Sequence, residues 1–439
     1  MPRLEGALIS SATAARTAVG RGDISAEDLI SHFVARGEER NTTIGAVRFL
    51  AADQALEAAQ EIDQRRKAGG PLPPLAGVPV VVKENCDTAG VPCSAGLSFR
   101  ADNRPPANAP VVTRLRDAGA IILGVSVSDP GAFGVRTIEV THPDDAALTV
   151  GGSSGGSAAA LAAGLCLAAI GTDTGGSIRI PSACCGTVGL KPSFGALPMD
   201  GVYPLIPSLD HVGPMARNVE DLTLMWDALC GGRQSGRPTR SIGFDPQWIR
   251  DANPVVAKGL ALVLERLERT GMIVKEVELP DLDDILEMHG RIFFVEGAAY
   301  HCANFGEDIP NYPAMAQEWF EMARHMPVAD YVHACERRVR FTSVVDQLLE
   351  EVDLILTPAL SVLHPQKDAP QLFVSGKPLD FTLAMVRQTC LFNHTGHPAL
   401  AMPMKKSTVM PPPSLQIVGR RGDESKILDF GKSIEQREI

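Results

Sequence analysis

The chain repeats one local order, in which a helix-forming segment is followed by glycine and then by a short aliphatic run. Residues 53–67 are good helix formers that close on a glycine pair, and the β-branched run "GVPVVVKEN" follows. Residues 110–117 and the run "AIILG" repeat the order across a single glycine. Helices that alternate with short apolar strands predict an α/β fold, in which the helices pack on a sheet.

The same order has its strongest signals near residue 253. Asn253 is a typical N-cap, Pro254 suits the first helical position, and apolar residues recur through Leu267. Gly271 then stops the helix, and the run "MIVKEVEL" predicts a strand over 272–279.

The length of 439 residues allows a large buried core. Segments 101–110 and 231–240 are rich in proline, glycine and polar residues, which predicts surface connections. The second segment is the best candidate for a domain boundary, but it is of moderate length. We therefore expect a single large domain rather than two.

Charge and hydropathy exclude several classes of protein. Lysine and arginine number 41 against 52 acidic residues, and the net charge of −11 argues against nucleic acid as a partner. The first residues lack a basic segment followed by a long apolar core, so no secretory signal is expected. The longest apolar stretch, 158–170, spans about 13 residues against the roughly 20 that a membrane helix needs. The sequence predicts a cytoplasmic protein with no membrane span.

The cysteines are odd in number and none is spaced as CxxC. They are Cys86, Cys93, Cys166, Cys184, Cys185, Cys230, Cys302, Cys335 and Cys390. This pattern predicts reduced thiols in a cytoplasmic protein, with neither a disulfide framework nor a zinc site.

Two clusters of glycine and serine carry the most chemistry. "VGGSSGGS" (150–157) and "GTDTGGSIRIP" (171–181) are separated by a helix-like Ala/Leu stretch and a short apolar strand. Such glycines allow close packing of a helix on a sheet, which is the purely structural interpretation. The alternative is a pocket of converging backbone N–H groups for a developing oxyanion. Its members are Thr174, Gly175, Gly176 and Ser177.

A serine nucleophile needs a base, and the histidines do not identify one. His142, His211, His394 and His397 lie in loop-like contexts, where solvated or structural roles are expected. Lys83 ends the apolar run 79–82, and partial desolvation there would lower its pKa toward neutrality. A lysine at a strand end can equally extend its charge to the surface, so both interpretations stand at this point.

The segment 150–192 resembles the signature segment of the amidase signature family, serine hydrolases with a Ser, cis-Ser, Lys triad. Further stretches resemble other parts of the family: "LAGVPVVVKEN", "SLDHVGPMARNVEDL", "VDLILTPAL", "NHTGHPALAMP" and "SLQIVGRRGDESKIL". The resemblance implies one domain over residues 1–439, with a central mixed β-sheet flanked by α-helices. Its core would be approximately 70–230 and 390–435, with a more variable substrate-pocket region at approximately 231–389.

The resemblance also implies a role for each matching residue. Ser177 would be the nucleophile, Ser153 the serine of a cis peptide after Gly152, and Lys83 the base that draws protons through Ser153. Supporting positions are Gly152, Ser154 near Lys83 or Ser153, and Asp173 and Arg179 as braces of the loop. An acyl-enzyme on Ser177 would release ammonia or an amine, without a metal or an organic cofactor.

The segment 124–150 departs from the family pattern, so we expect it to line the substrate pocket. Candidates for substrate contact there are Phe133, Arg136 and His142. The region 285–385 is expected to form one wall of the same pocket.

Three function classes remain open. The first is an amidase that acts alone, or as a homodimer, on a small-molecule amide. The second is the A-type component of the amidotransferase complex that amidates misacylated tRNA, although Asp380 and Asn393 are spaced too widely for its donor-binding segment. The third is an esterase, because Gly151, Ser153 and Gly155 satisfy G-x-S-x-G. That motif needs a strand before the serine and an indispensable histidine, and "THPDDAALT" is a poor strand.

Adjacent Cys184 and Cys185 are expected to be buried thiols rather than nucleophiles.

Overall fold

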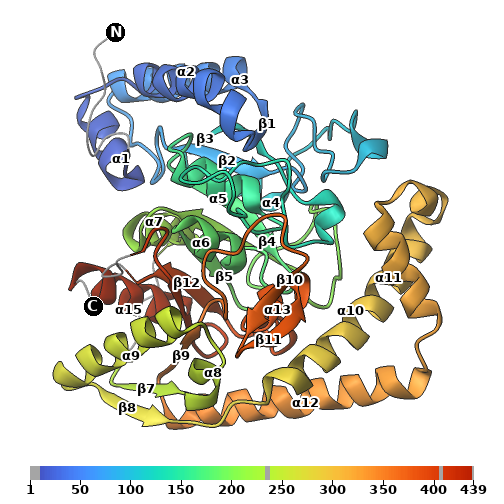
Figure 1. Ribbon diagram of the computed structural model, residues 1–439. Coiled ribbons are helices and arrows are strands. Elements are labelled where there is room, and N and C mark those ends of the chain that lie inside the picture. Colours follow the sequence, from blue (N-terminus) through green and yellow to red (C-terminus); the bar gives the residue numbers. More distant parts are fainter. Residues whose placement is uncertain (1–9, 233–237, 405–408, 438–439) are drawn as a thin grey trace.

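The computed structural model describes residues 10–232, 238–404 and 409–437 (Figure 1). The connection predicted over 231–240 therefore lies partly outside the described residues. Within the described ranges, a large central sheet has helices on its two faces, and no helix is both long and apolar enough to cross a membrane.

The central sheet has eleven strands in the order β1-β3-β2-β4-β6-β5-β12-β13-β9-β7-β8 within the described chain. The strands are β1 (Val47–Leu50), β2 (Pro79–Lys83), β3 (Ile121–Ser126), β4 (Ala168–Asp173), β5 (Val188–Lys191), β6 (His211–Ala216), β7 (Ser241–Phe244), β8 (Ile273–Glu276), β9 (Leu354–Pro358), β12 (Ala399–Pro403) and β13 (Ser414–Val418). Strand β2 pairs in parallel with β3 and β4, whereas β6 is antiparallel to β4. The sheet is mixed, as expected. Strands β10 (Gln371–Val374) and β11 (Lys377–Asp380) form a separate hairpin.

The helices surround this sheet. They are α1 (Ala12–Arg21), α2 (Ala26–Ile44), α3 (Ala52–Lys67), α4 (Pro110–Asp117), α5 (Gly155–Ala162), α6 (Arg179–Cys185), α7 (Val219–Cys230), α8 (Pro246–Arg250), α9 (Pro254–Arg269), α10 (Leu282–Asn304), α11 (Ala314–Arg324), α12 (Val328–Glu351), α13 (Phe381–Val386), α14 (Leu391–His394) and α15 (Glu424–Gln436). Short 3-10 turns are η2 (Ser98–Arg100), η3 (Pro130–Ala132) and η4 (Gly306–Asn311). Helices α10, α11 and α12 form an arm that extends away from the sheet (Figure 1).

The local signals of the sequence translate directly into several elements. The helix predicted over 110–117 is α4 with the same bounds, and the helix predicted over 53–67 is α3. At α9 the Asn253 side chain accepts a hydrogen bond from Val255 N, so the predicted cap is confirmed. The strand predicted over 272–279 is shorter, because β8 is an edge strand that pairs only with the four residues of β7.

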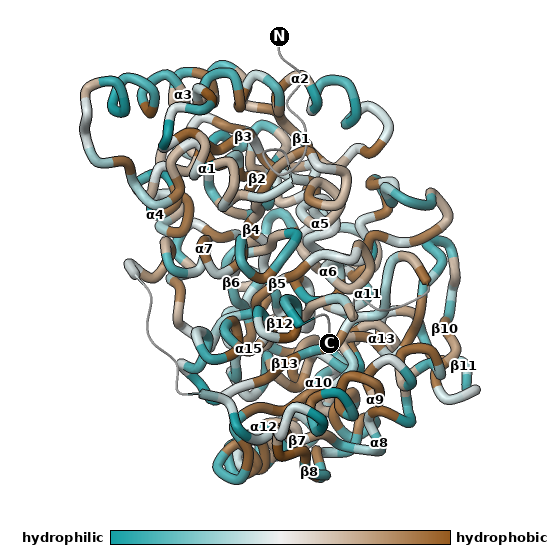
Figure 2. The backbone as a smooth tube through the Cα atoms, turned by 90° about the vertical axis from the view of Figure 1, so that its left-hand side faces the viewer, coloured by the Kyte–Doolittle hydropathy of each residue, from teal (hydrophilic) through white to brown (hydrophobic). Residues whose placement is uncertain are grey.

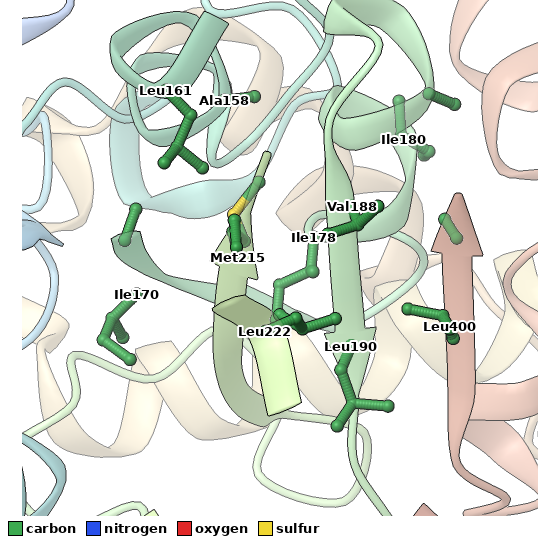
Figure 3. Packing of buried hydrophobic residues seen from close by; sticks show 14 of the residues in the cluster. Ala158, Leu161, Ile170, Ile178, Ile180, Val188, Leu190, Met215, Leu222 and Leu400 are labelled. Atoms are coloured by element: carbon green, nitrogen blue, oxygen red, sulfur yellow. The ribbon is translucent and has the colours of Figure 1, made fainter. Parts of the chain in front are cut away.

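The outer layer and the core differ in hydropathy as the amphipathic pattern requires. Figure 2 shows long hydrophilic stretches along α2 and α3 at the surface, with hydrophobic stretches in the strands that they cover. Close to the two glycine and serine clusters, Ala158 and Leu161 of α5 belong to the buried core and lie near Met215 of β6 (Figure 3). This packing fixes the segment that connects β4 to α6.

Ile178 anchors that connecting segment. Its side chain is fully buried (Figure 3) and lies against the glycines of three strands, because a Cβ built on Gly171 or Gly213 would lie 3.1 or 3.2 Å from it. A Cβ at Gly189 would lie 2.7 Å from Ile178 Cγ2, so a larger residue does not fit between strand and side chain. Because Ile178 directly follows Ser177, the core holds the backbone of Ser177 in place.

Candidate active site

Lys83 lies at the carboxyl end of β2, and its side chain is fully buried between the parallel neighbours β3 and β4. Its Nζ donates to Ser153 Oγ at 2.7 Å and to Thr172 Oγ1 at 2.8 Å. Burial lowers the pKa of Lys83 to about 8, although the carboxyl groups of Asp129 and Asp173 act in the opposite direction. About a tenth of this lysine is therefore neutral at pH 7, and the neutral fraction rises steeply above that pH.

The backbone around Ser153 is fixed by its neighbours. The peptide bond between Gly152 and Ser153 is cis, and the Ser153 carbonyl accepts a hydrogen bond from Asp129 N at 3.0 Å. A Cβ at Gly152 would lie 2.6 Å from the backbone of Val135, so only glycine fits there. The fully buried Ser153 side chain thus points its Oγ at Lys83.

The neighbouring Ser154 binds the strand that carries Thr172. Its Oγ donates to the Thr172 carbonyl at 3.1 Å and accepts from Thr172 N at 3.2 Å. Thr172 in turn accepts hydrogen bonds from Lys83 and, at 3.1 Å, from Asn85 Nδ2. Both glycine and serine clusters therefore meet at the end of β4.

Residues 174–177 form a bend between β4 and α6. Within the described residues, their backbone N–H groups have no hydrogen-bond acceptor. Thr389 Oγ1 donates to the Gly175 carbonyl at 2.6 Å, and Gly176 has a φ of 140° that favours glycine. Ser177 is only 6% exposed, and its carbonyl accepts from Ser154 N at 3.3 Å. The bend leaves a group of donors available to a bound molecule.

An ion pair lies below this bend. Arg179 Nη2 donates to Asp173 Oδ1 at 2.8 Å, and both side chains are fully buried. The guanidinium also reaches the side chains of Asn393 and Gln416, each at 2.7 Å. Burial disfavours ionisation of Asp173, but the Arg179 charge outweighs it and holds the pKa of Asp173 well below its ordinary value. Asp173 Oδ2 accepts from Ile178 N at 3.1 Å, so the pair is connected to the residue after Ser177.

A cavity of about 640 Å³ opens beside Ser177. Most of its wall is apolar and comes from α10, α11, α13 and the segment 132–135. Large side chains in the wall include Phe133, Leu286, Phe293, Phe294, Met315 and Trp319. The segments 124–150 and 285–385 therefore both contribute to the cavity.

Two of the three residues predicted to contact substrate are not brought to this cavity. Phe133 lines it, but Arg136 donates to the carbonyls of Lys367 and Ala369 and stacks on Phe381, 3.4 Å from the ring centre. His142 is buried, with Nε2 3.0 Å from the Cys184 carbonyl. A sequence pattern cannot show which residues of a loop turn inward, and neither of these residues is among the described lining residues.

The contexts expected for the histidines were partly wrong. His211 lies in β6 and His394 in the short helix α14, whereas loops were predicted for both. All four histidines are buried, and His142 and His397 lie outside helices and strands. Their hydrogen bonds fit structural roles for His142, His211 and His397.

Sequence reasoning missed several residues that surround the site. Thr172 contacts Lys83, and Asp210 Oδ1 accepts from Thr174 Oγ1 at 2.6 Å. His289 lines the cavity, and Thr389 holds the Gly175 carbonyl. Thr172 was visible as a polar residue at the end of an apolar strand, but the other three come from distant segments. Within the described residues, no group of three or more His, Cys, Asp or Glu side chains is arranged to hold a metal ion.

Comparison with known proteins gives this geometry a family. The Amidase family model matches residues 28–428. The chain belongs to the amidase family. As an amidase it is an enzyme that hydrolyses amide C–N bonds, and its fold is the amidase signature fold.

Similar proteins extend over nearly the whole chain. The A-type component of glutamyl-tRNA(Gln) amidotransferase from Chloroflexus aggregans is 32% identical over 97% of this chain and 95% of its own. A putative amidase AmiD of Mycobacterium bovis is 29% identical over 99% of this chain and 96% of its own. A crystal structure of an amidase superimposes with a TM-score of 0.89 at 30% identity, covering 97% of this chain and 99% of the other.

Proposed function

We propose that this amidase hydrolyses a small-molecule amide through an acyl-enzyme on Ser177, with Ser153 as proton relay and Lys83 as base. The observation that carries the proposal is the contact of 2.7 Å between a fully buried lysine and Ser153. The next residue, Ser154, donates from its backbone N–H to the carbonyl of Ser177, which borders the cavity. A neutral lysine can accept a proton, and burial favours that neutral form.

The reaction proceeds by two proton transfers in each direction. Lys83 takes the Ser153 proton while Ser153 takes the Ser177 proton, and Ser177 Oγ attacks the amide carbon. The carbonyl oxygen becomes negative and is stabilised by the free N–H groups of residues 174–177. The C–N bond then breaks as the proton returns through Ser153 to the leaving nitrogen. Water attacks the acyl-enzyme by the same route, which releases the acid and restores Ser177.

The cavity favours an uncharged, apolar substrate. Its buried wall is aliphatic and aromatic, so it gains most from burying apolar surface. The charged lining residues are three acidic side chains, Glu287, Glu318 and Asp380, against the single cation Arg291. Arg291 is paired with Glu287 at 2.6 Å, so the net negative charge of this lining opposes a free carboxylate.

The second candidate is the amidotransferase activity, which the names of several relatives favour. Glutamine, its amide donor, is a zwitterion, and its α-carboxylate would find no unpaired cation among the described lining residues. Asn393 is also occupied, because its side chain binds Asp173 and Arg179, while Asp380 caps α13. We therefore place this activity second.

An esterase built on G-x-S-x-G would use Ser153 as its nucleophile. Ser153 is fully buried and is not among the lining residues of the cavity, whereas Ser177 is. No strand directly precedes Ser153 in the described chain. The geometry therefore supports Ser177.

Purified protein without added partners tests the proposal, with ammonia release from a broad panel of amides as the readout. Ser177→Ala and Lys83→Ala should each lower kcat/KM by about 10⁴-fold or more while the protein stays folded by circular dichroism. Ser182→Ala is the matched control, because this buried α6 serine has no side-chain hydrogen-bond partner in the described structure. Normal turnover by Ser177→Ala would refute the mechanism, and turnover only with partner proteins of a complex would favour the amidotransferase.

A further inference from the structure

Few polar side chains reach the buried part of the cavity. Its acidic lining residues are exposed, and most of the buried lining residues are apolar. Among the described lining residues, the buried polar side chains are Thr174, Ser177 and His289. Ser177 is the proposed nucleophile, and the Thr174 hydroxyl donates to Asp210. Of these three buried polar side chains, His289 is therefore the one that has no role in the proposed reaction.

His289 is held by a second histidine. Its Nδ1 lies 2.9 Å from Nε2 of His394, and the two rings are almost perpendicular, at 84°. His289 comes from α10 and His394 from α14, so the contact joins the arm to the body of the protein. Burial lowers the pKa of His289 to about 4, which leaves one N–H on its ring at neutral pH.

The contact with His394 fixes which nitrogen of His289 carries that proton. His394 Nδ1 is buried and has no hydrogen-bond partner in the described structure. A buried N–H without an acceptor is less tolerable than a bare lone pair, so the His394 proton belongs on Nε2. His394 then donates to His289 Nδ1, and the His289 proton must lie on Nε2.

That Nε2–H group faces the cavity beside the bend formed by residues 174–177. A Cβ built on Gly175 would lie 3.2 Å from His289 Cε1 and 3.4 Å from Nε2. This edge of the imidazole is thus packed against the residue whose backbone N–H is proposed to bind the oxyanion. Within the described structure, Nε2 has no hydrogen-bond partner. A donor in this position lies near any group attached to the scissile carbonyl.

We propose that His289 is a specificity-determining residue, which donates from Nε2 to an acceptor oxygen carried by the substrate next to the scissile carbonyl. The inference rests on the proposed function. It narrows the substrate class to uncharged, apolar amides whose acyl group carries an ether, carbonyl or hydroxyl oxygen close to the reacting carbon. A site with one buried donor discriminates strongly against an analogue that lacks the matching acceptor.

Two amides of nearly equal shape test the proposal. Benzyloxyacetamide has an ether oxygen where 4-phenylbutanamide has a CH₂ group, and both are uncharged and achiral. The readout is the ratio of their kcat/KM values, ether over alkyl, in the full-length protein. Intrinsic differences in carbonyl reactivity cancel when this ratio is compared between variants.

Three variants distinguish the effect of losing the N–H donor at His289 Nε2 from the effect of losing the hydrogen bond between His289 and His394. His289→Asn places its amide near the former Nδ1 and keeps a partner for His394, but it loses the donor at Nε2. His289→Gln places an NH₂ group near the former Nε2. We expect the ratio to fall about tenfold in His289→Asn and to recover in His289→Gln. His394→Leu, outside the lining residues, should lower the ratio part of the way because the proton position is no longer fixed.

Each outcome decides one of the two proposals. Equal ratios in the wild type, His289→Asn and His394→Leu overturn the proposed role of His289. In that case, loss of hydrolysis of both amides in Ser177→Ala would still support the proposed function. Should His289→Asn fail to fold, the His394→Leu ratio decides in the same way. If the wild type hydrolyses no amide of the panel, the proposed function itself fails.

Discussion

The protonation state of Lys83 makes the pH dependence of turnover the most direct test of the mechanism. Burial lowers the pKa of this lysine from 10.5 to about 8, which corresponds to about 3 kcal/mol in favour of the neutral amine. Only the neutral form can accept a proton, so activity must rise as pH increases through about 8. The neutral fraction is about a tenth at pH 7 and about nine-tenths at pH 9. We therefore expect kcat/KM to rise about tenfold between these two values.

Replacing Asp129 should shift the pKa of Lys83 in a direction that can be stated in advance. Its buried carboxyl group accepts from Arg136 N at 3.0 Å, and its charge favours the protonated form of Lys83. Burial raises the pKa of Asp129 to about 7, so its charge is largely present at pH 8. Asp129→Asn removes the charge with little change in shape. The midpoint of the profile should then move down, by on the order of half a pH unit.

The assay is kcat/KM for ammonia release between pH 6 and pH 10, because this quantity reports the ionisations of the free enzyme. Circular dichroism at each pH shows that the protein stays folded over the range. A profile that is flat from pH 6 to pH 9, or a midpoint that moves upward in Asp129→Asn, would refute the assignment of Lys83 as base.

Two further predictions concern the support of the site. Arg179→Met leaves the buried carboxylate of Asp173 without its cation and should lower the free energy of unfolding by about 3 to 5 kcal/mol, measured by urea denaturation. Adding Asp173→Asn to the Arg179→Met variant should restore part of this free energy. If the double variant recovers none of it, the result argues against the ion pair. Gly176→Ala would place a Cβ 2.3 Å from Thr389 Oγ1 at a φ of 140°, so kcat should fall at least tenfold. Gly306→Ala is the control, because no atom lies within 4 Å of its Cβ, and equal activity of the two variants would contradict the prediction.

Local signals were sufficient for many elements of the fold. Gly119, which follows the helix-forming residues 110–117, marked the end of α4, and Asn253 marked the start of α9, because caps and stops depend on neighbouring residues. The length of β8 was not predictable in the same way. It depends on β7, which is distant in the sequence and offers only four residues for pairing.

The site shows the same division between local and distant information. The bend 174–177 and its N–H groups follow from adjacent glycines, and the sequence placed Lys83 at a strand end. The pairing of His289 with His394 joins residues 105 positions apart, and no local pattern connects them. Arg136 and His142 were plausible pocket residues by position, but their side chains bind backbone carbonyl groups elsewhere. Only the folded chain reveals that competition.

The arm formed by α10, α11 and α12 has a practical consequence for engineering. Lys83, Ser153 and Ser177 lie before residue 180, whereas much of the cavity wall comes from α10 and α11. A mutant library confined to inward-facing positions of those two helices, with position 289 kept, would therefore vary selectivity without changing the three residues that we propose to react. Variants with new substrate preferences can be selected from such a library, while the residues proposed to break the amide bond stay the same in every variant.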